Sequence, residues 1–473
     1  MLTTITEIMN AIIIAALIIC FSYQAIFLFA PFVKKHYFKK KDGTETFTIE
    51  KKHRYGVLIA ARNEEAVIAN LIHSIQEQTY NKNLVDIFVV ADNCTDRTAE
   101  VARFAGANVY ERFDKELVGK GYALKYLLDQ LMQMERWCEY DGFFIFDADN
   151  LLEKDFIEEM NHTFGQGYPV VTSYRNSTNF GDNWISSGYA IWFLHEAQWL
   201  NRGRMAVGSN CMVQGTGYMV SREVLEKNDG WKFFLLTEDI EFTADCMLHD
   251  IRIGYCEKAM FYDEQPTRFK DSWNQRIRWI KGYFQVFKKY RKQLVRGVLR
   301  NECAEDEAKS GTSVIKKERQ IRRRRLSCYD MLMAQLPAFV VTAFASAVSI
   351  LLLIIGIATA QDVAFVIRTI VEFLIKIYAA MFLLAIYTVF TEWKHIHMPI
   401  VKKIGYIVTF PIYMYTYVPI SFAALKKKVE WKPIAHKASS MEQIKTAAAT
   451  KKKLPDNRSK RIPLEVSFSF YRK

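Results

Sequence analysis

Two hydrophobic patterns divide the chain of 473 residues. Long apolar runs cover residues 11–29, 331–360 and 377–390, whereas shorter apolar runs alternate with amphipathic stretches between residues 50 and 265. A helix of about twenty apolar residues crosses the roughly 30 Å hydrocarbon core of a bilayer. The pattern therefore predicts membrane segments on either side of a soluble domain.

Short apolar runs within the soluble domain predict buried strands at residues 57–60, 87–90 and 143–146, with helical patterns between them. Continuous apolar strands joined by helices are typical of a parallel sheet that is covered on both faces. The predicted fold class is therefore α/β. Ligands of such sheets bind beyond the carboxyl ends of the strands, and Asp92 and Asp147 fall at two of these ends.

We expect six segments along the chain, in this order: a transmembrane anchor at 1–33, the α/β domain at 50–265, basic and aromatic interfacial helices at 266–300, a linker at 301–326, a second transmembrane or interfacial region at 330–425, and a basic tail at 426–473. The first apolar run is interpreted as a retained anchor rather than a signal peptide, because no basic segment precedes it.

The formal net charge is +13, but the basic residues cluster beside the apolar runs. Clusters at 34–41, 322–325 and 426–428 follow the rule that cytosolic loops next to membrane spans carry excess Lys and Arg. Such clusters also attract anionic lipids. We therefore expect membrane lipids and no nucleic acid as partners, and a multi-pass cell-membrane protein whose α/β domain is cytosolic. Residues 404–425 either cross again or form an interfacial or re-entrant hairpin; the basic cluster after them favours the hairpin.

Acidic residues at the strand ends are the first candidates for chemistry. Asp147 and Asp149 follow a buried strand one residue apart, and two such oxygen ligands suit Mg²⁺ or Mn²⁺ bridging a diphosphate. An isolated Asp-x-Asp is often only a solvated turn. Asp92 closes an earlier strand and could accept hydrogen bonds from a uracil or a ribose.

Two further residues have both a nucleotide-binding and a structural interpretation. Glu64 opens a helix after the first strand, where it could contact a nucleotide or simply favour the helix dipole. Lys120 lies between two glycines. In a flexible loop its ammonium could reach a phosphate, or the segment could be a surface turn.

Later motifs supply candidates for the reaction itself. Glu238 and Asp239 precede a helical pattern, and a carboxylate there could act as general base toward a hydroxyl group or cap the helix. In the segment of Gln275, Arg278 and Trp279, the guanidinium could stabilise a departing diphosphate and the indole could stack on a sugar. Read alone, that segment is an ordinary amphipathic helix.

Together these motifs resemble family 2 glycosyltransferases, and more narrowly the membrane synthases of cellulose, chitin, hyaluronan and poly-N-acetylglucosamine. The resemblance covers about residues 50–290 and the flanking membrane segments. It implies a GT-A fold, Mg²⁺ or Mn²⁺, a UDP-sugar donor (UDP-N-acetylglucosamine or UDP-glucose) and inversion at the anomeric carbon. The implied reaction extends a β-linked polysaccharide.

The resemblance also assigns roles. It implies that Asp92 contacts the nucleotide, that Asp147 contacts the diphosphate or ribose, and that Asp149 holds the metal. Asp239 is the implied base. The acceptor and pyrophosphate site is lined by Gln275, Arg278 and Trp279, next to an acceptor loop at residues 214–217, while residues 431–434 loosely resemble a segment that covers the nucleotide.

Departures from the synthases leave an alternative open. One clear span precedes the catalytic domain, where several relatives have two or more. The chain then makes a shorter product, needs an export partner subunit, or builds its channel from fewer helices. The alternative is transfer of one sugar to a lipid, either a polyprenyl phosphate or a glycolipid, because ceramide-type glucosyltransferases share a similar pattern. Arg368, Glu372 and Lys376 recur every four residues and form either a polar wall for a glycan or a paired surface stripe.

Overall fold

The computed structural model describes residues 2–38, 51–299, 314–335 and 363–426, with a few helical positions between 344 and 355. Three sequence predictions fall wholly or largely outside the described residues. These are the basic tail from residue 427 with its segment 431–434, residues 301–313 of the linker, and most of the apolar run 331–360.

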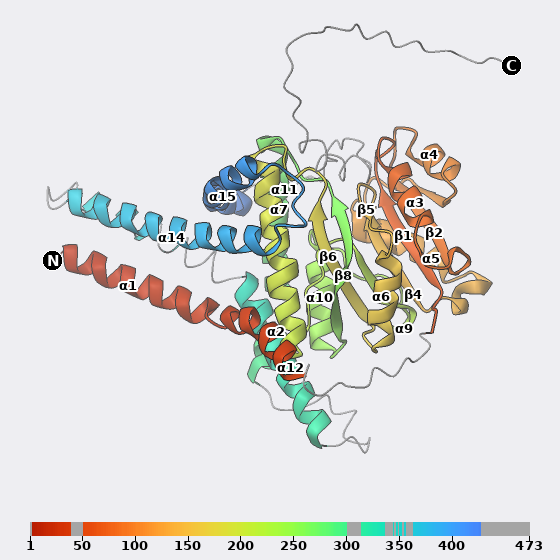
Figure 1. Ribbon diagram of the computed structural model, residues 1–473, viewed down its shortest axis with the longest axis horizontal. Helices are drawn as coiled ribbons and strands as arrows, with labels where there is room; N and C mark the ends of the chain where they lie inside the picture. Colours follow the sequence, from red (N-terminus) through yellow and green to blue (C-terminus); the bar gives the residue numbers. More distant parts are fainter. Residues whose placement is uncertain are drawn as a thin grey trace, which may run out of the picture.

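The described residues build an eight-stranded sheet in the order β3-β2-β1-β4-β7-β6-β8-β5 (Figure 1). Neighbours among β3, β2, β1 and β4 pair in parallel, as do β6 and β8, whereas β7 is antiparallel to both β4 and β6, and β5 is antiparallel to β8. The α/β class is confirmed, and the sheet is mixed rather than parallel throughout. The strands are β1 (Tyr55–Ala61), β2 (Val85–Asp92), β3 (Asn108–Arg112), β4 (Gly142–Asp147), β5 (Leu151–Leu152), β6 (Val170–Ser177), β7 (Tyr218–Ser221) and β8 (Ile253–Asp263).

Helices cover both faces of the sheet. Successive residues of a strand point to opposite faces, so neighbouring strand residues belong to different cores. Leu58 and Val90 belong to one core, which includes residues of α5 (Lys120–Leu131), α7 (Trp184–His195) and α10 (Glu238–Leu248). Val57 and Val89 belong to the other, with α3 (Ile68–Gln76), α4 (Thr98–Phe104) and α6 (Phe156–Gly165). This two-sided burial explains why the strands are apolar without alternation.

The strand register brings two predicted site residues to one edge. Asp147 of β4 pairs with Ala60 of β1, and Asp92 ends β2 one residue beyond the partner of Ala61. The carboxyl ends of β2 and β4 therefore flank the end of β1.

The predicted interfacial stretch 266–300 contains a single long helix, α11 (Phe269–Leu299). This helix packs against α10, α12 (Val314–Gln335) and α16 (Tyr417–Lys426). Shorter elements complete the domain: η1 (Lys82–Leu84), η2 (Glu135–Glu139), the π-helical segment η3 (Glu196–Asn201), α8 (Arg202–Val207) and α9 (Arg222–Lys227).

Three helical stretches in the described part of the chain are long and apolar enough to cross a membrane: Ala11–Val33, Ile370–Thr391 and Ile400–Leu425. The first is shared by α1 (Leu2–Phe21) and α2 (Gln24–Phe38), and the second lies in α14 (Val363–Thr391). Helices α1 and α14 contact each other and project together away from the sheet (Figure 1). The third is broken at Thr416 into α15 (Ile400–Tyr415) and α16, which pack on α7 and α11; the hairpin stays a prediction.

All three residues of the polar stripe on α14 are exposed, and two of them form an ion pair. The Nε atom of Arg368 lies 3.0 Å from Oε1 of Glu372, and their side chains are 77% and 48% exposed. Lys376 is exposed as well. This pairing matches the surface-stripe interpretation of the three residues.

A buried ionic network ties the N-terminal helices to α12. Arg204 is 1% exposed, and its Nε donates to Oδ2 of Asp330 at 2.6 Å. The hydroxyl of Tyr23, in the turn between α1 and α2, donates to Oδ1 of the same carboxylate at 2.6 Å. Residues far apart in sequence are thereby joined through Asp330, which is fully buried.

The network predicts a large stability loss for Asp330→Ala, because the substitution leaves the buried guanidinium of Arg204 with one carboxylate fewer. Breaking a buried pair from one side costs about 3–5 kcal/mol. We expect a lower melting temperature of the detergent-solubilised protein. The matched control is Asp271→Ala, whose partner Arg268 is 76% exposed at 3.6 Å. Equal melting temperatures for the two variants would contradict the prediction.

Candidate active site

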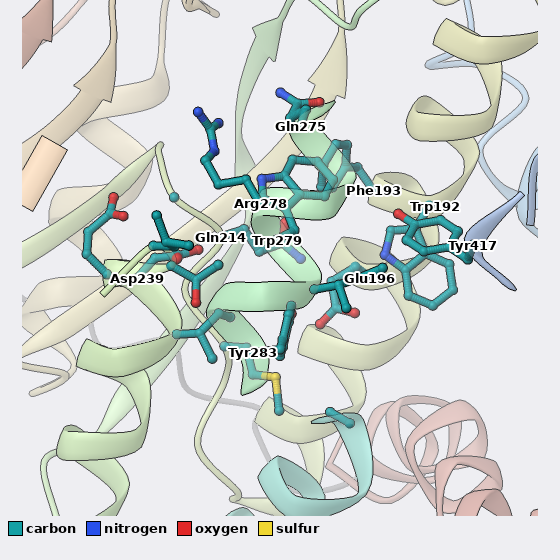
Figure 2. A pocket seen from close by; sticks show the side chains of 18 of the residues that line it. Trp192, Phe193, Glu196, Gln214, Asp239, Gln275, Arg278, Trp279, Tyr283 and Tyr417 are labelled. Carbon is teal, nitrogen blue, oxygen red and sulfur yellow. The ribbon is translucent and has the colours of Figure 1, made fainter. Parts of the chain in front are cut away.

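One cavity of about 1020 Å³ lies where the strand ends, α10, α11 and the membrane helices meet. All ten residues that the sequence predicted for catalysis, nucleotide binding and metal binding line it, although the first and the last are more than two hundred positions apart: Glu64, Asp92, Lys120, Asp147, Asp149, Glu238, Asp239, Gln275, Arg278 and Trp279. Figure 2 shows Asp239 on one side of this cavity, and Trp192, Glu196 and Tyr417 on the opposite side.

Asp92 is held by an arginine that the sequence analysis did not identify. The Nη1 atom of Arg112, the last residue of β3, lies 2.6 Å from Oδ1 of Asp92, and both side chains are 7% exposed. The Nδ2 atom of Asn93 also donates to Oδ1, at 3.1 Å. In the described chain Oδ2 has no hydrogen-bond partner, so this oxygen can accept from a ligand in the cavity.

The loops after β1 and β2 are fastened to each other, which positions Glu64. The backbone N–H of Glu64 donates to the Thr98 hydroxyl at 2.8 Å. Asn63 adopts a positive φ of 58°, and its side-chain oxygen accepts from the Thr95 N–H at 2.8 Å. Glu64 thus stands at the start of a rigid turn on the cavity wall.

Lys120 is the first residue of α5 rather than part of a flexible loop. Its ammonium forms an ion pair with Oδ1 of Asp147 and donates to the carbonyl oxygen of Gly215 at 2.6 Å. A Cβ at Gly121 would lie 2.1 Å from the carbonyl oxygen of Phe233, so the close packing of this helix start requires glycine. The cation therefore faces the cavity.

Asp149 lies beside the end of β8. Its Oδ2 accepts from the Glu264 N–H at 3.3 Å. Asp263, the last residue of β8, accepts from Nε of Arg175 at 2.9 Å through Oδ2, while its Oδ1 is buried with no hydrogen-bond partner among the described residues.

These carboxylates fit a divalent cation that binds together with a diphosphate. The described residues contain no group of three or more His, Cys, Asp or Glu side chains arranged as a metal site. However, Mg²⁺ in proteins commonly uses one or two carboxylates plus substrate phosphates. The oxygen donors of Asp149 and the unsatisfied Oδ1 of Asp263 suit that kind of binding.

Asp239 and Glu238 form the first turn of α10, where the helix dipole favours negative charge. Burial nevertheless raises the pKa of Asp239 to about 6. Burial and the charge of Asp239 raise the pKa of Glu238 to about 7. Gly215 lies next to this pair, since a Cβ there would be 3.7 Å from Oδ2 of Asp239. A carboxylate with such a pKa can accept a proton near neutral pH.

Gln275, Arg278 and Trp279 share one face of α11. The Trp279 ring packs edge-on against Tyr189 at 5.5 Å and Phe193 at 6.1 Å, centroid to centroid. Burial lowers the pKa of the Arg278 guanidinium, whereas Glu238 and Asp147 raise it; an arginine stays charged in either case. This face brings a cation and an indole to the acidic strand ends.

Arg276, between these residues, faces the membrane helices instead. It is fully buried, and its guanidinium lies 4.5 Å and 4.9 Å from the ring centroids of Tyr413 and Tyr417. Its Nη1 donates to the Thr416 hydroxyl at 2.6 Å, at the break between α15 and α16. The sequence analysis did not assign this role, because its partners are more than 130 residues away.

The cavity continues toward the membrane helices, and there its lining changes. That half contains apolar side chains from α1, α14 and α16: Leu17, Phe21, Ile370, Phe373, Leu374, Ile377, Met381, Val418 and Phe422. Arg368, Glu372 and Lys376 do not line it. Trp192, Glu196 and Tyr283 also line the cavity (Figure 2).

Comparison with known proteins finds similarity to glycosyltransferases. Residues 53–282 match the family model described as glycosyltransferase like family 2. A β-monoglucosyldiacylglycerol synthase from Synechocystis is 26% identical over 240 residues, 50% of this chain and 48% of that protein. A poly-β-1,6-N-acetyl-D-glucosamine synthase from Staphylococcus epidermidis is 21% identical over 276 residues, 56% of this chain and 64% of that protein.

The chain spans about half the length of the glucosyldiacylglycerol synthases that it matches. Among solved structures, a mannosyltransferase from Pyrobaculum calidifontis, in complex with GDP-mannose and Mn²⁺, superimposes with a TM-score of 0.45 at 17% identity, over 77% of this chain and 99% of that one. The family match agrees with the GT-A fold that the sequence resemblance implied. Residues 53–282 are therefore similar to family 2 glycosyltransferases, and the described part of the chain also contains helical stretches long and apolar enough to cross a membrane.

Proposed function

We propose that the protein transfers one sugar from a UDP-sugar to a hydroxyl group of a membrane lipid, with inversion at the anomeric carbon. The observation that carries this proposal is the apolar lining of the membrane half of the cavity, which includes Phe21, Phe373 and Phe422. Burying an acyl chain there gains about 0.8 kcal/mol per CH₂. A polysaccharide would leave its many hydroxyl groups without partners along the same wall.

The similarity to β-monoglucosyldiacylglycerol synthases supports the lipid acceptor. It also favours UDP-glucose, whereas the similarity to poly-N-acetylglucosamine synthases favours UDP-N-acetylglucosamine. We further propose that the protein passes through the membrane several times, with the catalytic domain in the cytosol, where nucleotide-sugars are found.

The proposed reaction uses the charged half of the cavity for the donor. Oδ2 of Asp92 accepts from the nucleotide, and Lys120 exchanges its pairing with Asp147 for the diphosphate. Asp239 removes the proton from the acceptor hydroxyl as that oxygen attacks the anomeric carbon, and Arg278 stabilises the charge on the leaving UDP. Asp149, with Asp263 beside it, would hold Mg²⁺ or Mn²⁺, which neutralises the diphosphate.

A second candidate function is extension of a β-linked polysaccharide. The aromatic surfaces of Trp192, Phe193 and Trp279 around the acceptor side of the cavity favour it, since sugar rings stack on such faces. The similarity to the poly-N-acetylglucosamine synthases favours it as well. For this function, the growing polysaccharide would need a path across the membrane, with or without an export partner subunit.

The two functions predict different products. We expect purified protein in vesicles with UDP-[¹⁴C]glucose or UDP-N-acetyl-[¹⁴C]glucosamine, Mg²⁺ and diacylglycerol to give a label that extracts into chloroform and carries one sugar. Thin-layer chromatography and mass spectrometry measure it. Label that remains in the aqueous phase as a long polymer would overturn the lipid proposal in favour of the second candidate.

Asp239→Asn is expected to lower kcat by about 10²- to 10⁴-fold, because the amide cannot accept the hydroxyl proton. In the unmodified protein, kcat should fall as the pH drops through about 6, since protonation of Asp239 removes the base. Asp229→Asn is the matched control, because Asp229 is exposed and its φ of 53° is one that Asn adopts readily. Full activity of Asp239→Asn would rule out the assigned base.

Removing divalent cations with EDTA is expected to abolish transfer, and Mg²⁺ or Mn²⁺ to restore it. Asp149→Asn should raise the metal concentration that gives half-maximal UDP binding, measured by calorimetry without acceptor. UDP affinity that is independent of both metal and this substitution would contradict the proposed cation site.

A further inference from the structure

We propose that Glu196 binds the hydroxyl groups of the acceptor, and that the membrane half of the cavity selects a neutral alcohol over a lipid phosphate. This inference rests on the proposed lipid acceptor and narrows its chemical class.

Glu196 begins the only π-helical segment that the described residues contain, Glu196–Asn201, directly after α7. Such wide turns insert an extra residue into a helix and occur often at functional sites. Here the turn directs the carboxylate into the cavity near Trp192 and Tyr283 (Figure 2). The side chain is 13% exposed, so a ligand in the cavity would remove the last water around it.

One carboxylate oxygen of Glu196 is occupied and the other is available. Nη1 of Arg204 donates to Oε1 at 2.5 Å, and Arg204 is itself fixed by Asp330. Oε2 has no hydrogen-bond partner in the part of the chain that the structure describes. A fixed, half-paired carboxylate is a strong acceptor for a hydroxyl hydrogen.

The charge of this half of the cavity disfavours phosphate. Apart from tyrosine hydroxyls, its described ionisable groups are Glu196 and Arg204, and Asp330 lies behind Arg204. Two carboxylates against one guanidinium leave one negative charge, and the guanidinium is already paired with both. The other lining cations are Arg62, Lys120, Arg175 and Arg278. Arg175 pairs with Asp263, and Lys120 and Arg278 interact with the acidic residues of the donor half.

A neutral alcohol fits both the available Oε2 of Glu196 and the net negative charge of the membrane half. Its hydroxyl group can donate to Oε2 of Glu196, and its chains can lie along the apolar lining from α14 and α16. An anionic headgroup would instead meet Oε2 with no donor to offer and a like charge to face. Glu196 therefore acts as a specificity-determining contact rather than as a second base.

The test compares two short lipid acceptors, 1,2-dioctanoylglycerol and farnesyl phosphate, with the full-length protein. We expect the unmodified enzyme to glycosylate dioctanoylglycerol and not farnesyl phosphate. Glu196→Gln should raise the KM for dioctanoylglycerol by roughly 10- to 100-fold, because hydrogen bonds to charged groups are the stronger ones. The KM for the UDP-sugar, and the slow release of UDP without acceptor, should stay within about twofold.

Glu257→Gln is the matched control. Glu257 lies near Glu196 in the fold and pairs with Arg202 at 3.0 Å, but it does not line the cavity. We expect both KM values of this variant to be unchanged.

Three outcomes would overturn the inference alone: equal use of farnesyl phosphate by the unmodified enzyme, an unchanged acceptor KM in Glu196→Gln, or parallel losses in donor and acceptor kinetics together with a lower melting temperature. The last would assign Glu196 a structural role through Arg204. Polymer without any lipid product would instead overturn the proposed function, and the inference with it.

Discussion

The position of α11 is the constraint on which the site depends. A Cβ at Gly282 would lie 2.5 Å from Cγ2 of Thr237, so this helix approaches the turn before Asp239 as closely as a backbone can. Two turns earlier, Arg276 is buried among the rings of Tyr413 and Tyr417. One continuous helix therefore sets both the separation of Arg278 from the acidic turn and the distance of the α/β domain from the membrane helices.

The cavity that results has two chemically different halves. In the donor half, Arg112 and Lys120 neutralise Asp92 and Asp147 before any ligand arrives, which lets several carboxylates face one space without strong repulsion. In the membrane half, apolar side chains of the membrane helices dominate the lining. The indole of Trp279 lies between the two halves of the cavity, where the proposed reaction transfers the sugar from donor to acceptor.

The sequence predicted the acidic half well, because each residue there follows a local signal. Asp92 and Asp147 close apolar strands, so their convergence followed from the rule that parallel strands end at one edge. Asp239 opens a helix, and the sequence placed it beside them only on condition that the fold brought it to the same edge. The short strand β7, with only four residues (Tyr218–Ser221), gives no comparable pattern, and its reversed direction was not predicted.

The residues that sequence reasoning missed are held by long-range partners. Arg204 depends on Asp330, 126 positions away, and Arg276 on Thr416, 140 positions away; no local periodicity reports such pairs. Arg112 was the exception, since it ends a strand at the same edge as Asp92 and could have been identified by the same rule. The basic run 322–325, predicted as a flank of a membrane segment, also forms ion pairs within the fold. Arg323 and Arg324 each lie 3.8 Å from the carboxylate of Asp250.

The break at Thr416 has a mechanical consequence. Arg276 donates to the Thr416 hydroxyl, so a tilt of α16 relative to α15 pulls on α11. Helices in bilayers tilt when the hydrocarbon thickness changes. A tilt that a bilayer imposed on α16 would therefore act on the helix that carries Arg278 and Trp279.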